Sequence, residues 1–278
     1  MSKLYNIKNW TRQNLREWMD EKAGSQAKVQ AFRADQVFYW LYQQRVGSFA
    51  EMLNLGKETR KLLEENFWIS KLKKADEQYS QDGSIKYRLL LEDGKSIESV
   101  FMPHTSHNTV CVSSQVGCGM GCDFCMTGTM GLIRNLKTSE IIDQVLTVSN
   151  DLEEGKNLRN IVFMGMGEPL DNYEATIDSI KLMISPEALR LSTRKITLST
   201  AGQVDLINKF KEEELSINLA ISLNATDNET RENIMPINKK YPIEVLIDCL
   251  KKYPLKPQRR HTIEYVLLEG INDSDEDA

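Results

Sequence analysis

Three cysteines, Cys118, Cys122 and Cys125, lie in one glycine-rich loop with the spacing C-x3-C-x2-C. Three thiolates this close, with no fourth at a matching interval, suit a [4Fe–4S] cluster in which one iron stays open. An open iron can bind a small molecule through that molecule's own donor atoms. S-adenosylmethionine (SAM) is the best-known such ligand, because its amino and carboxylate groups chelate the metal. The spacing therefore predicts radical chemistry at a bound cluster.

A structural zinc site is the alternative, with Cys111 or with His104 and His107 as further ligands. Zinc sites usually combine two short-spaced pairs of ligands, whereas Cys111 falls within a predicted strand, seven residues before Cys118. The pattern therefore favours iron–sulfur over zinc. The fifth cysteine, Cys249, lies among apolar residues of a predicted helix and is expected to be a buried bystander.

Polar and glycine residues end three later strands. Residues 165–170 follow the second strand, where Glu168 could hold the ammonium group of a cluster-bound amino acid, although a tight turn explains the glycines equally well. Residues 199–202 and 222–224 end the next two strands. Their hydroxyl and amide groups suit a ribose or a carboxylate, or ordinary turn chemistry.

Strands and helices alternate from about residue 108 onward. Strands are predicted at 109–114, 160–164, 195–199, 217–223 and 261–268, with helices near 139–154, 172–185, 203–213 and 242–253. Single strands that alternate with helices predict an α/β fold with a parallel sheet, open or closed into a barrel. Ligands of such folds bind at the carboxyl ends of the strands, and the cysteine loop follows the first strand. The predicted cluster therefore lies at that end of the sheet.

The preceding residues have a different character. Residues 1–74 predict a small helical domain, in which Thr11 caps one helix and Ser48 to Glu51 form a capping box. Asp82-Gly83 and Asp93-Gly94 are hairpin dipeptides, and they predict a β-hairpin unit over residues 75–107. The α/β core then occupies residues 108–278.

The last seven residues, 272–278, have the cap candidates and acidic first turn of a helix start, yet the chain stops there. A strand–helix repeat that ends at a cap leaves an apolar sheet edge uncovered. We therefore expect the sequence to be truncated or completed by another chain. A frayed acidic tail is the alternative.

Composition narrows the class of protein. The 278 residues are 41% hydrophobic, which suffices for one large domain or for one large and one small domain. No apolar run reaches about 18 residues, and the first residues lack the apolar core of a secretion signal. Five cysteines, three of them in one loop, fit a reducing compartment. We expect a cytoplasmic protein with no membrane segment.

The charge is unevenly distributed. The net charge is -5, which by itself argues weakly against a nucleic-acid partner. Residues 1–75 nevertheless carry 14 Lys and Arg against 8 Asp and Glu, whereas the remainder carries 21 against 32. A basic N-terminal module could bind RNA through its phosphates, although solvated helix faces explain the pattern equally well.

The chain resembles the radical-SAM 23S rRNA (adenine-C2)-methyltransferases of the RlmN family, which also modify tRNA. The likeness runs through nearly the whole chain and includes residues 32–36, 82–86, 111–118, 165–170, 199–202, 235–238 and 272–274. The cysteine triplet is common to all radical-SAM enzymes, while the other segments are specific to this family and to the related Cfr-type C8-methyltransferases. Pro169 favours the C2 branch, since the Cfr branch usually has alanine there.

The resemblance implies a fold and a set of site residues. The fold is a partial radical-SAM (β/α) barrel that follows the helical domain and hairpins and lacks its last strands. The implied roles are cluster ligands for Cys118, Cys122 and Cys125, SAM contacts for Gly167, Glu168, Ser199, Ser222, Leu223 and Asn224, a proton acceptor for Glu98, and a resolving cysteine for Cys111. Glu98 lies in an alternating strand, where a solvent-facing carboxylate is the default interpretation. The implied partners are 23S rRNA, tRNA and an electron donor of the flavodoxin or ferredoxin type, and the protein is expected to be a monomer.

The implied chemistry has two stages. One SAM methylates a C-terminal cysteine, and a second SAM is cleaved to a radical that activates this methyl group for addition to C2 of adenine. Cys111 then forms a transient disulfide with the methyl-carrying sulfur, and Glu98 removes the C2 proton. Radicals are needed because C2 of adenine is electron-poor and does not attack a sulfonium methyl group.

The chain departs from the family in one respect. The methyl-carrying cysteine would lie beyond residue 278, and Cys249 does not stand in the matching context. We therefore expect this chain as written to bind a cluster without completing methyl transfer. The alternatives are an RNA methyltransferase that acts at adenine C8 and a non-catalytic, metal-bound RNA-binding fragment.

Overall fold

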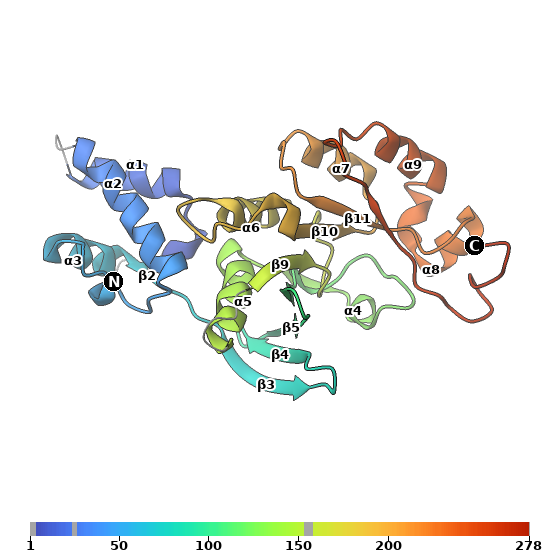
Figure 1. Cartoon of the computed structure of the whole chain (residues 1–278), viewed down its shortest axis with the longest axis horizontal. Helices are drawn as coiled ribbons and strands as arrows, with labels where there is room; N and C mark the ends of the chain where they lie inside the picture. Colours follow the sequence, from blue (N-terminus) through green and yellow to red (C-terminus); the bar gives the residue numbers. More distant parts are fainter. Residues whose placement is uncertain (1–3, 24–26, 153–157, 278) are drawn as a thin grey trace.

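The computed structural model describes residues 4–23, 27–152 and 158–277 (Figure 1). Residues 153 and 154, which end the predicted helix 139–154, lie outside this range, as do residues 1–3 and 278 of the predicted domains. The helices are α1 (Arg12–Ala23), α2 (Ala27–Phe38), α3 (Lys57–Asn66), α4 (Met126–Thr129), α5 (Thr138–Asp151), α6 (Tyr173–Ile184), α7 (Val204–Lys211), α8 (Asn228–Ile234) and α9 (Ile243–Lys251). The strands are β1 (Tyr5–Asn6), β2 (Phe67–Trp68), β3 (Lys73–Tyr79), β4 (Ile85–Leu90), β5 (Ser96–Met102), β6 (Asn108–Cys111), β7 (Gln115–Gly117), β8 (Leu132–Asn135), β9 (Leu158–Phe163), β10 (Ile196–Thr200), β11 (Asn218–Ser222) and β12 (Thr262–Glu264).

An eight-stranded sheet organises the molecule, with the strand order β12-β11-β10-β9-β6-β5-β4-β3. Strands β6, β9, β10, β11 and β12 are parallel, and helices separate them along the chain. These five strands coincide with the five that the alternating pattern predicts, and the α/β fold is confirmed. Strands β3, β4 and β5 extend the sheet in antiparallel pairing beyond β6.

The two Asp-Gly dipeptides form the turns of this antiparallel part. Gly83 and Gly94 have positive φ angles of 84° and 79°, a conformation that glycine adopts without steric cost. The preceding aspartates hold the turns, because the carboxylate of Asp82 accepts from the backbone of Ser84 and that of Asp93 from the backbone of Lys95. The long β3–β4 hairpin extends away from the helices at the bottom of Figure 1.

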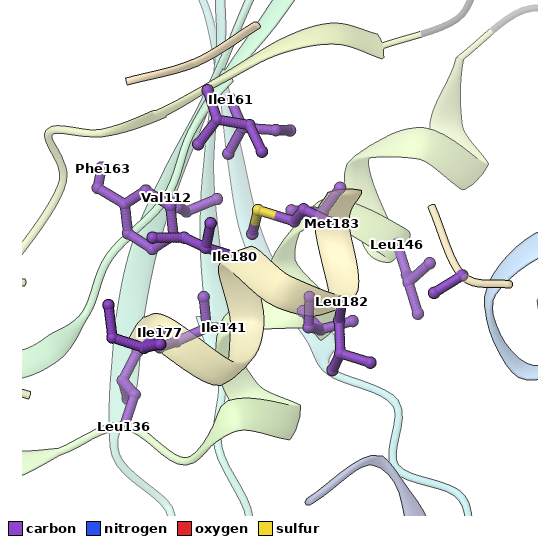
Figure 2. Close-up of a cluster of buried hydrophobic side chains, with 14 of the residues drawn as sticks. Val112, Leu136, Ile141, Leu146, Ile161, Phe163, Ile177, Ile180, Leu182 and Met183 are labelled. Carbon is purple, nitrogen blue, oxygen red and sulfur yellow. The ribbon is translucent and has the colours of Figure 1, made fainter. Parts of the chain in front are cut away.

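Helices α5 and α6 cover one face of the sheet. Figure 2 shows Ile180 and Met183 of α6 directed toward Val112, Ile161 and Phe163 at the sheet. All five side chains are at most 1% exposed. Each fully buried aliphatic or aromatic side chain contributes roughly 1.5–3 kcal/mol relative to exposure, so this layer fixes the parallel strands in place.

The strand register places polar residues of several strands on the other face. Residues that pair directly, or that lie two apart on a strand, share a face. Neighbouring strands are connected by the pairs Val100–Cys111, Cys111–Val162, Val162–Thr197, Ser199–Ala220 and Ser222–Glu264. It follows that one face carries Glu98, Cys111, Ser199, Ser222 and Glu264, and we call it the open face.

The N-terminal helices lie at one end of the molecule, coloured blue in Figure 1. Helix α1 begins after Thr11, whose hydroxyl accepts from the backbone of Asn14 as the capping prediction requires. Leu15 and Met19 of this helix are buried. The capping box of Ser48 is also present, although it starts only a short 3-10 turn.

A buried ion pair joins this N-terminal part to the core. Lys8 is 3% exposed and donates to the carboxylate of Asp143 on α5 and to the carbonyl of Ser70. Asp143 also accepts from the hydroxyl of Ser70. Burial raises the pKa of Asp143, and the charge of Lys8 opposes this effect.

Residues 271–277 form turns and bends, in which the backbone N–H and the hydroxyl of Ser274 donate to the carboxylate of Asp277, and the predicted helix start there stays a prediction. The side chain of Asn272, one of the cap candidates, is buried and used elsewhere. It donates to the carbonyls of Asn224 and Val266 and accepts from the backbone of Leu268. Over residues 4–23, 27–152 and 158–277, every helix is too short or too polar to serve as a membrane span.

Replacement of Lys8 by methionine should lower the free energy of unfolding by about 3–5 kcal/mol, because it leaves the Asp143 carboxylate buried without its cation. Lys61→Met is the control, since Lys61 is an exposed residue 3.9 Å from Glu65 and should cost less than about 1 kcal/mol. Urea unfolding of the three proteins checks this. Equal losses in the two variants would contradict a stabilising role for the buried pair.

Candidate functional site

A cavity of about 290 Å³ lies at the carboxyl ends of the parallel strands. The cavity is lined by eight of the predicted site residues, Cys118, Cys122, Cys125, Gly167, Glu168, Ser199, Ser222 and Asn224. The remaining three, Glu98, Cys111 and Leu223, do not line it. A larger cavity of about 450 Å³ near residues 211–218 and 253–260 contains none of the predicted site residues.

The cysteine loop runs from the end of β7 to the start of α4. Gly117 makes the turn before Cys118 possible, because its φ is 77° and a Cβ there would lie 1.9 Å from the carbonyl oxygen of Gly131. The Cys118 backbone donates to that same carbonyl, and the Cys125 backbone donates to the carbonyl of Cys122. These bonds hold three thiols around one cavity.

The three thiols are of a type that binds metal once the thiol proton is lost. All five cysteines of the chain are free of disulfides. Burial raises the pKa of Cys118 and raises that of Cys122 to about 12, so both are protonated unless a metal takes the place of the proton. Within the described part of the chain, no three His, Cys, Asp or Glu side chains are grouped closely enough to hold a single metal ion.

Glu168 closes the cavity beside the cysteines. It is 3% exposed, and its carboxylate accepts from the backbone N–H groups of Ala201 at 2.7 Å and Leu170 at 3.1 Å. Its own N–H donates to the side chain of Gln115. Gly167 allows this close packing, since a Cβ there would lie 2.5 Å from the Cβ of Gln115. Burial raises the pKa of Glu168 to about 7, and a bound cation would lower it again.

Ser199 and Ser222 meet at a third residue that the sequence patterns do not identify. Both hydroxyls donate to the same carboxylate oxygen of Glu264 on β12, Ser222 at 3.0 Å. Glu264 lies in the predicted strand 261–268, and its position as a carboxylate inside a strand is the one signal that could have marked it.

Asn224 and Leu223 connect β11 to the segment after β12. Asn224 has a φ of 60° and is 1% exposed, and its side chain accepts from the backbone of Val266. The Leu223 backbone donates to the carbonyl of Glu264 at 3.0 Å. The side chain of Asn224 is therefore engaged within the protein, and a ligand would meet this segment mainly through its backbone.

Cys111 and Glu98 lie on the open face of the sheet, which also carries the cavity residues Ser199 and Ser222. Cys111 pairs with Val100, two residues from Glu98 on the same strand. Burial, together with the negative charge of Glu264, raises the pKa of the Cys111 thiol to about 11. Glu98 is about half exposed and forms an ion pair with Lys86 at 3.1 Å. The structure thus brings both residues to one face, and their roles stay predictions.

The histidines of the zinc alternative lie elsewhere. His104 and His107 stack on each other with ring centroids 4.4 Å apart, in the loop between β5 and β6. Neither lines the cavity of the three cysteines. Cys249 is buried on α9, as expected of a bystander.

The raised pKa of Glu168 predicts a pH dependence of stability in the ligand-free protein. A pKa of about 7 in the folded state, against an ordinary value of 4.5, contributes stability that is complete below pH 4.5 and is lost as the pH rises through 7. The loss is on the order of 3 kcal/mol. Glu168→Gln should abolish this component, whereas Glu229→Gln at an exposed position should retain it. Urea unfolding from pH 4.5 to 8 measures the slopes, and parallel slopes for wild type and Glu168→Gln would contradict the assignment.

Two family comparisons cover most of the chain. Residues 112–278 match the radical SAM superfamily, and residues 5–69 match the ribosomal RNA large subunit methyltransferase N-terminal domain. The first match contains the cysteine loop and every residue that lines the cavity. The second covers the N-terminal helices.

Similar proteins agree with these matches. The chain is 51% identical over 247 residues to a dual-specificity RNA methyltransferase RlmN of Geobacter sulfurreducens, covering 89% of this chain and 67% of the relative. It is 45% identical over 274 residues to a probable dual-specificity RNA methyltransferase RlmN of Aquifex aeolicus, covering 98% and 77%.

A crystal structure of a radical SAM methyltransferase from Sphaerobacter thermophilus superposes with a TM-score of 0.89 at 38% identity, over 98% of this chain and 79% of that one. The two folds therefore agree over nearly the whole length of this chain. The chain therefore belongs to the radical SAM superfamily and, within it, to the RlmN family of RNA methyltransferase enzymes.

Proposed function

We propose that this chain forms the cluster- and SAM-binding part of an enzyme that methylates C2 of an adenosine in 23S rRNA and in tRNA. The observation that supports this most is the single cavity in which three free thiols, a buried carboxylate and two serine hydroxyls meet at the carboxyl ends of parallel strands. The dual RNA specificity is taken from the names of the relatives, and Pro169 favours C2 over C8.

Cys118, Cys122 and Cys125 would hold a [4Fe–4S] cluster and leave one iron open to SAM. When bound and reduced, for example by a flavodoxin or ferredoxin, such a cluster supplies the electron that cleaves SAM to a radical. The protein's contribution is the shape of the loop. Its glycines let the backbone pass close to a bulky group, and burial limits access of water.

The other cavity residues would orient SAM. The carboxylate of Glu168 is placed to accept from the ammonium group, an interaction between opposite charges that burial strengthens. The backbone of Gly167 lies beside it. Ser199, Ser222 and Asn224 would contact the ribose or the carboxylate, because they border the same cavity. A contact from the backbone of the adjacent Leu223, which does not line the cavity, is part of the same proposal.

Cys111 and Glu98 would complete methyl transfer on the open face. Glu98 would remove the C2 proton of the protein–RNA adduct. The thiolate of Cys111 would attack the methyl-carrying sulfur, so that an S–S bond forms as the S–C bond to the RNA breaks, and the released carbon would take up a proton to become the methyl group. With a pKa of about 11, the Cys111 thiol must lose its proton before it attacks.

The RNA would approach the open face and the basic N-terminal helices. We assign RNA binding to the helical domain of residues 1–74, connection to the hairpin unit of residues 75–107, and chemistry to the radical-SAM core of residues 108–278. Lys86 and Arg88 of β4 extend the basic surface toward Glu98, since Arg88 pairs directly with Glu98. We expect the protein to act as a monomer.

Anaerobic reconstitution should give about four iron and four sulfide per chain, the content of one [4Fe–4S] cluster. Cys122→Ser should lose the cluster because it removes a ligand. Cys249→Ser should retain it, because Cys249 lies on α9 outside the cavity. Iron and sulfide analysis with visible absorption measures this. Zinc alone in the wild-type protein would refute the cluster assignment.

The RNA product tests the reaction itself. A gene that encodes this chain together with its methyl-carrying cysteine should produce 2-methyladenosine in both 23S rRNA and tRNA when it is expressed in a bacterial host that lacks its own enzyme of this family. Nucleoside mass spectrometry is the measurement, and Cys125→Ala in the same gene should abolish the signal. Appearance of 8-methyladenosine instead would favour the C8 alternative. Absence of both a methylated nucleoside and SAM cleavage would favour a non-catalytic RNA-binding role.

A further inference from the structure

One charged side chain beside the cavity has no part in the proposed reaction. Arg231 of α8 is 0% exposed and is the largest fully buried side chain of the described residues. Its neighbours include an apolar cluster that contains Ala225, Ile234 and Met235, with Cys122 and Phe124 packed against it. A guanidinium in such a place loses its hydration, which costs several kcal/mol unless other charges or dipoles replace the water.

Neutral oxygens satisfy all of its hydrogen bonds. The guanidinium donates to the carbonyls of Leu223 at 2.9 Å, Ala201 at 2.8 Å, Ser222 at 3.2 Å and Tyr241 at 3.4 Å, and to the side-chain oxygen of Asn238 at 3.0 Å. An arginine has five N–H donors, and these five acceptors use them all. Arg231 therefore cannot donate a hydrogen bond to a ligand without giving up one of these contacts.

The positive charge remains without a counter-charge. Across residues 4–23, 27–152 and 158–277, no carboxylate lies within ion-pair distance of Arg231. Burial lowers its pKa to about 10, which still leaves it protonated at neutral pH. The cysteine loop lies close by, since Cys122 packs against the apolar cluster that contains Ala201, and the Ala201 carbonyl accepts from Arg231.

Three of the acceptors lie at the ends of two parallel strands beside the cavity. Ala201 follows β10, Ser222 ends β11, and Leu223 follows it, while Ala201 and Ser222 also line the cavity. The hydrogen bonds of Arg231 therefore connect the ends of β10 and β11, which border the cavity. The same contact gives a structural role to Asn238 in the segment 235–238, which is one of the segments that carry the family resemblance. The side chain of Asn238 accepts from Arg231 and donates to the carbonyl of Asn228.

We propose that Arg231 is the built-in counter-charge of the anionic cluster, a positioning residue that fixes the strand ends and favours the reduced, more negative cluster. The inference rests on the proposed function, because it assumes that the three thiolates hold an iron–sulfur cluster. Addition of one electron makes the cluster more negative, and a nearby buried cation stabilises that form more than the oxidised one.

To test this proposal, a carboxylate is introduced beside Arg231 by substitution, and the reduction potential of the cluster is measured. Asn238→Asp places a negative charge next to the guanidinium, whereas Asn238→Ala removes the same amide without adding a charge. Each cluster-loaded protein is titrated anaerobically and the reduced cluster is followed by electron paramagnetic resonance. We expect Asn238→Asp to lower the ratio of reduced to oxidised cluster about tenfold at a fixed potential, which for a one-electron couple is a shift of about 59 mV to more negative values.

A second pair of variants keeps the test decisive if the aspartate disturbs folding. Arg231→Lys retains the charge and should keep a potential near that of the wild type, whereas Arg231→Met should shift it in the same direction as Asn238→Asp. Circular dichroism of each protein selects the folded variants. A purely structural role predicts lower melting temperatures with unchanged potentials.

The outcomes separate the two hypotheses. Equal potentials for Asn238→Asp and Asn238→Ala, in proteins that contain a full cluster, would overturn the role of Arg231 and leave the proposed function intact. A wild-type protein that takes up no iron and sulfide would overturn the proposed function, and the role of Arg231 with it.

Discussion

The parallel pairing of β6 with β9, β10, β11 and β12 is the constraint on which the rest of the structure depends. Parallel strands that are connected by helices all end at the same edge, so the segments that follow them meet there. Glu168, Ser199 and Ser222 are far apart in the sequence, yet they border one cavity because each follows or ends one of these strands. Cys118 reaches the same cavity after β7, the short strand that comes after β6 in the chain. The buried layer of α5 and α6 keeps the strands in register, and any one-residue slip would turn the polar residues away from the open face.

Burial then gives these residues their chemical character. The cavity raises the pKa of Glu168 and of two cysteines, which makes each of them a poor host for charge until a ligand supplies the opposite charge. Arg231 is the opposite case, a cation held by neutral dipoles beside the thiols. An anionic cluster would supply the negative charge that Arg231 lacks, and the ammonium group of SAM would supply the positive charge that favours the ionised form of Glu168.

Much of the fold and part of the site could be predicted from sequence because their signals are local. The Asp-Gly turns, the cap at Thr11 and the alternation of apolar strands with helices each depend on a few neighbouring residues, and each is present in the structure. The C-x3-C-x2-C spacing is local as well. These features indicated which strand ends should meet, and therefore where the cavity lies.

The features that sequence reasoning missed depend on contacts between distant segments. Glu264 receives hydrogen bonds from two serines, on β10 and on β11, and its position as a carboxylate inside a strand does not reveal these distant partners. Arg231 looks like an ordinary residue of an exposed helix until α8 packs against the strand ends. The buried position of Asn272, one of the predicted cap candidates, was missed for the same reason, since its side chain donates to the carbonyls of Asn224 and Val266.

The most direct test of the account is electron–nuclear double resonance of the reduced, reconstituted protein with SAM that carries ¹⁷O in its carboxylate. The account predicts a hyperfine coupling between the cluster and the labelled oxygen, because three cysteine ligands leave one iron open to the substrate. A fully formed cluster that shows no coupling to the label under saturating SAM would contradict it.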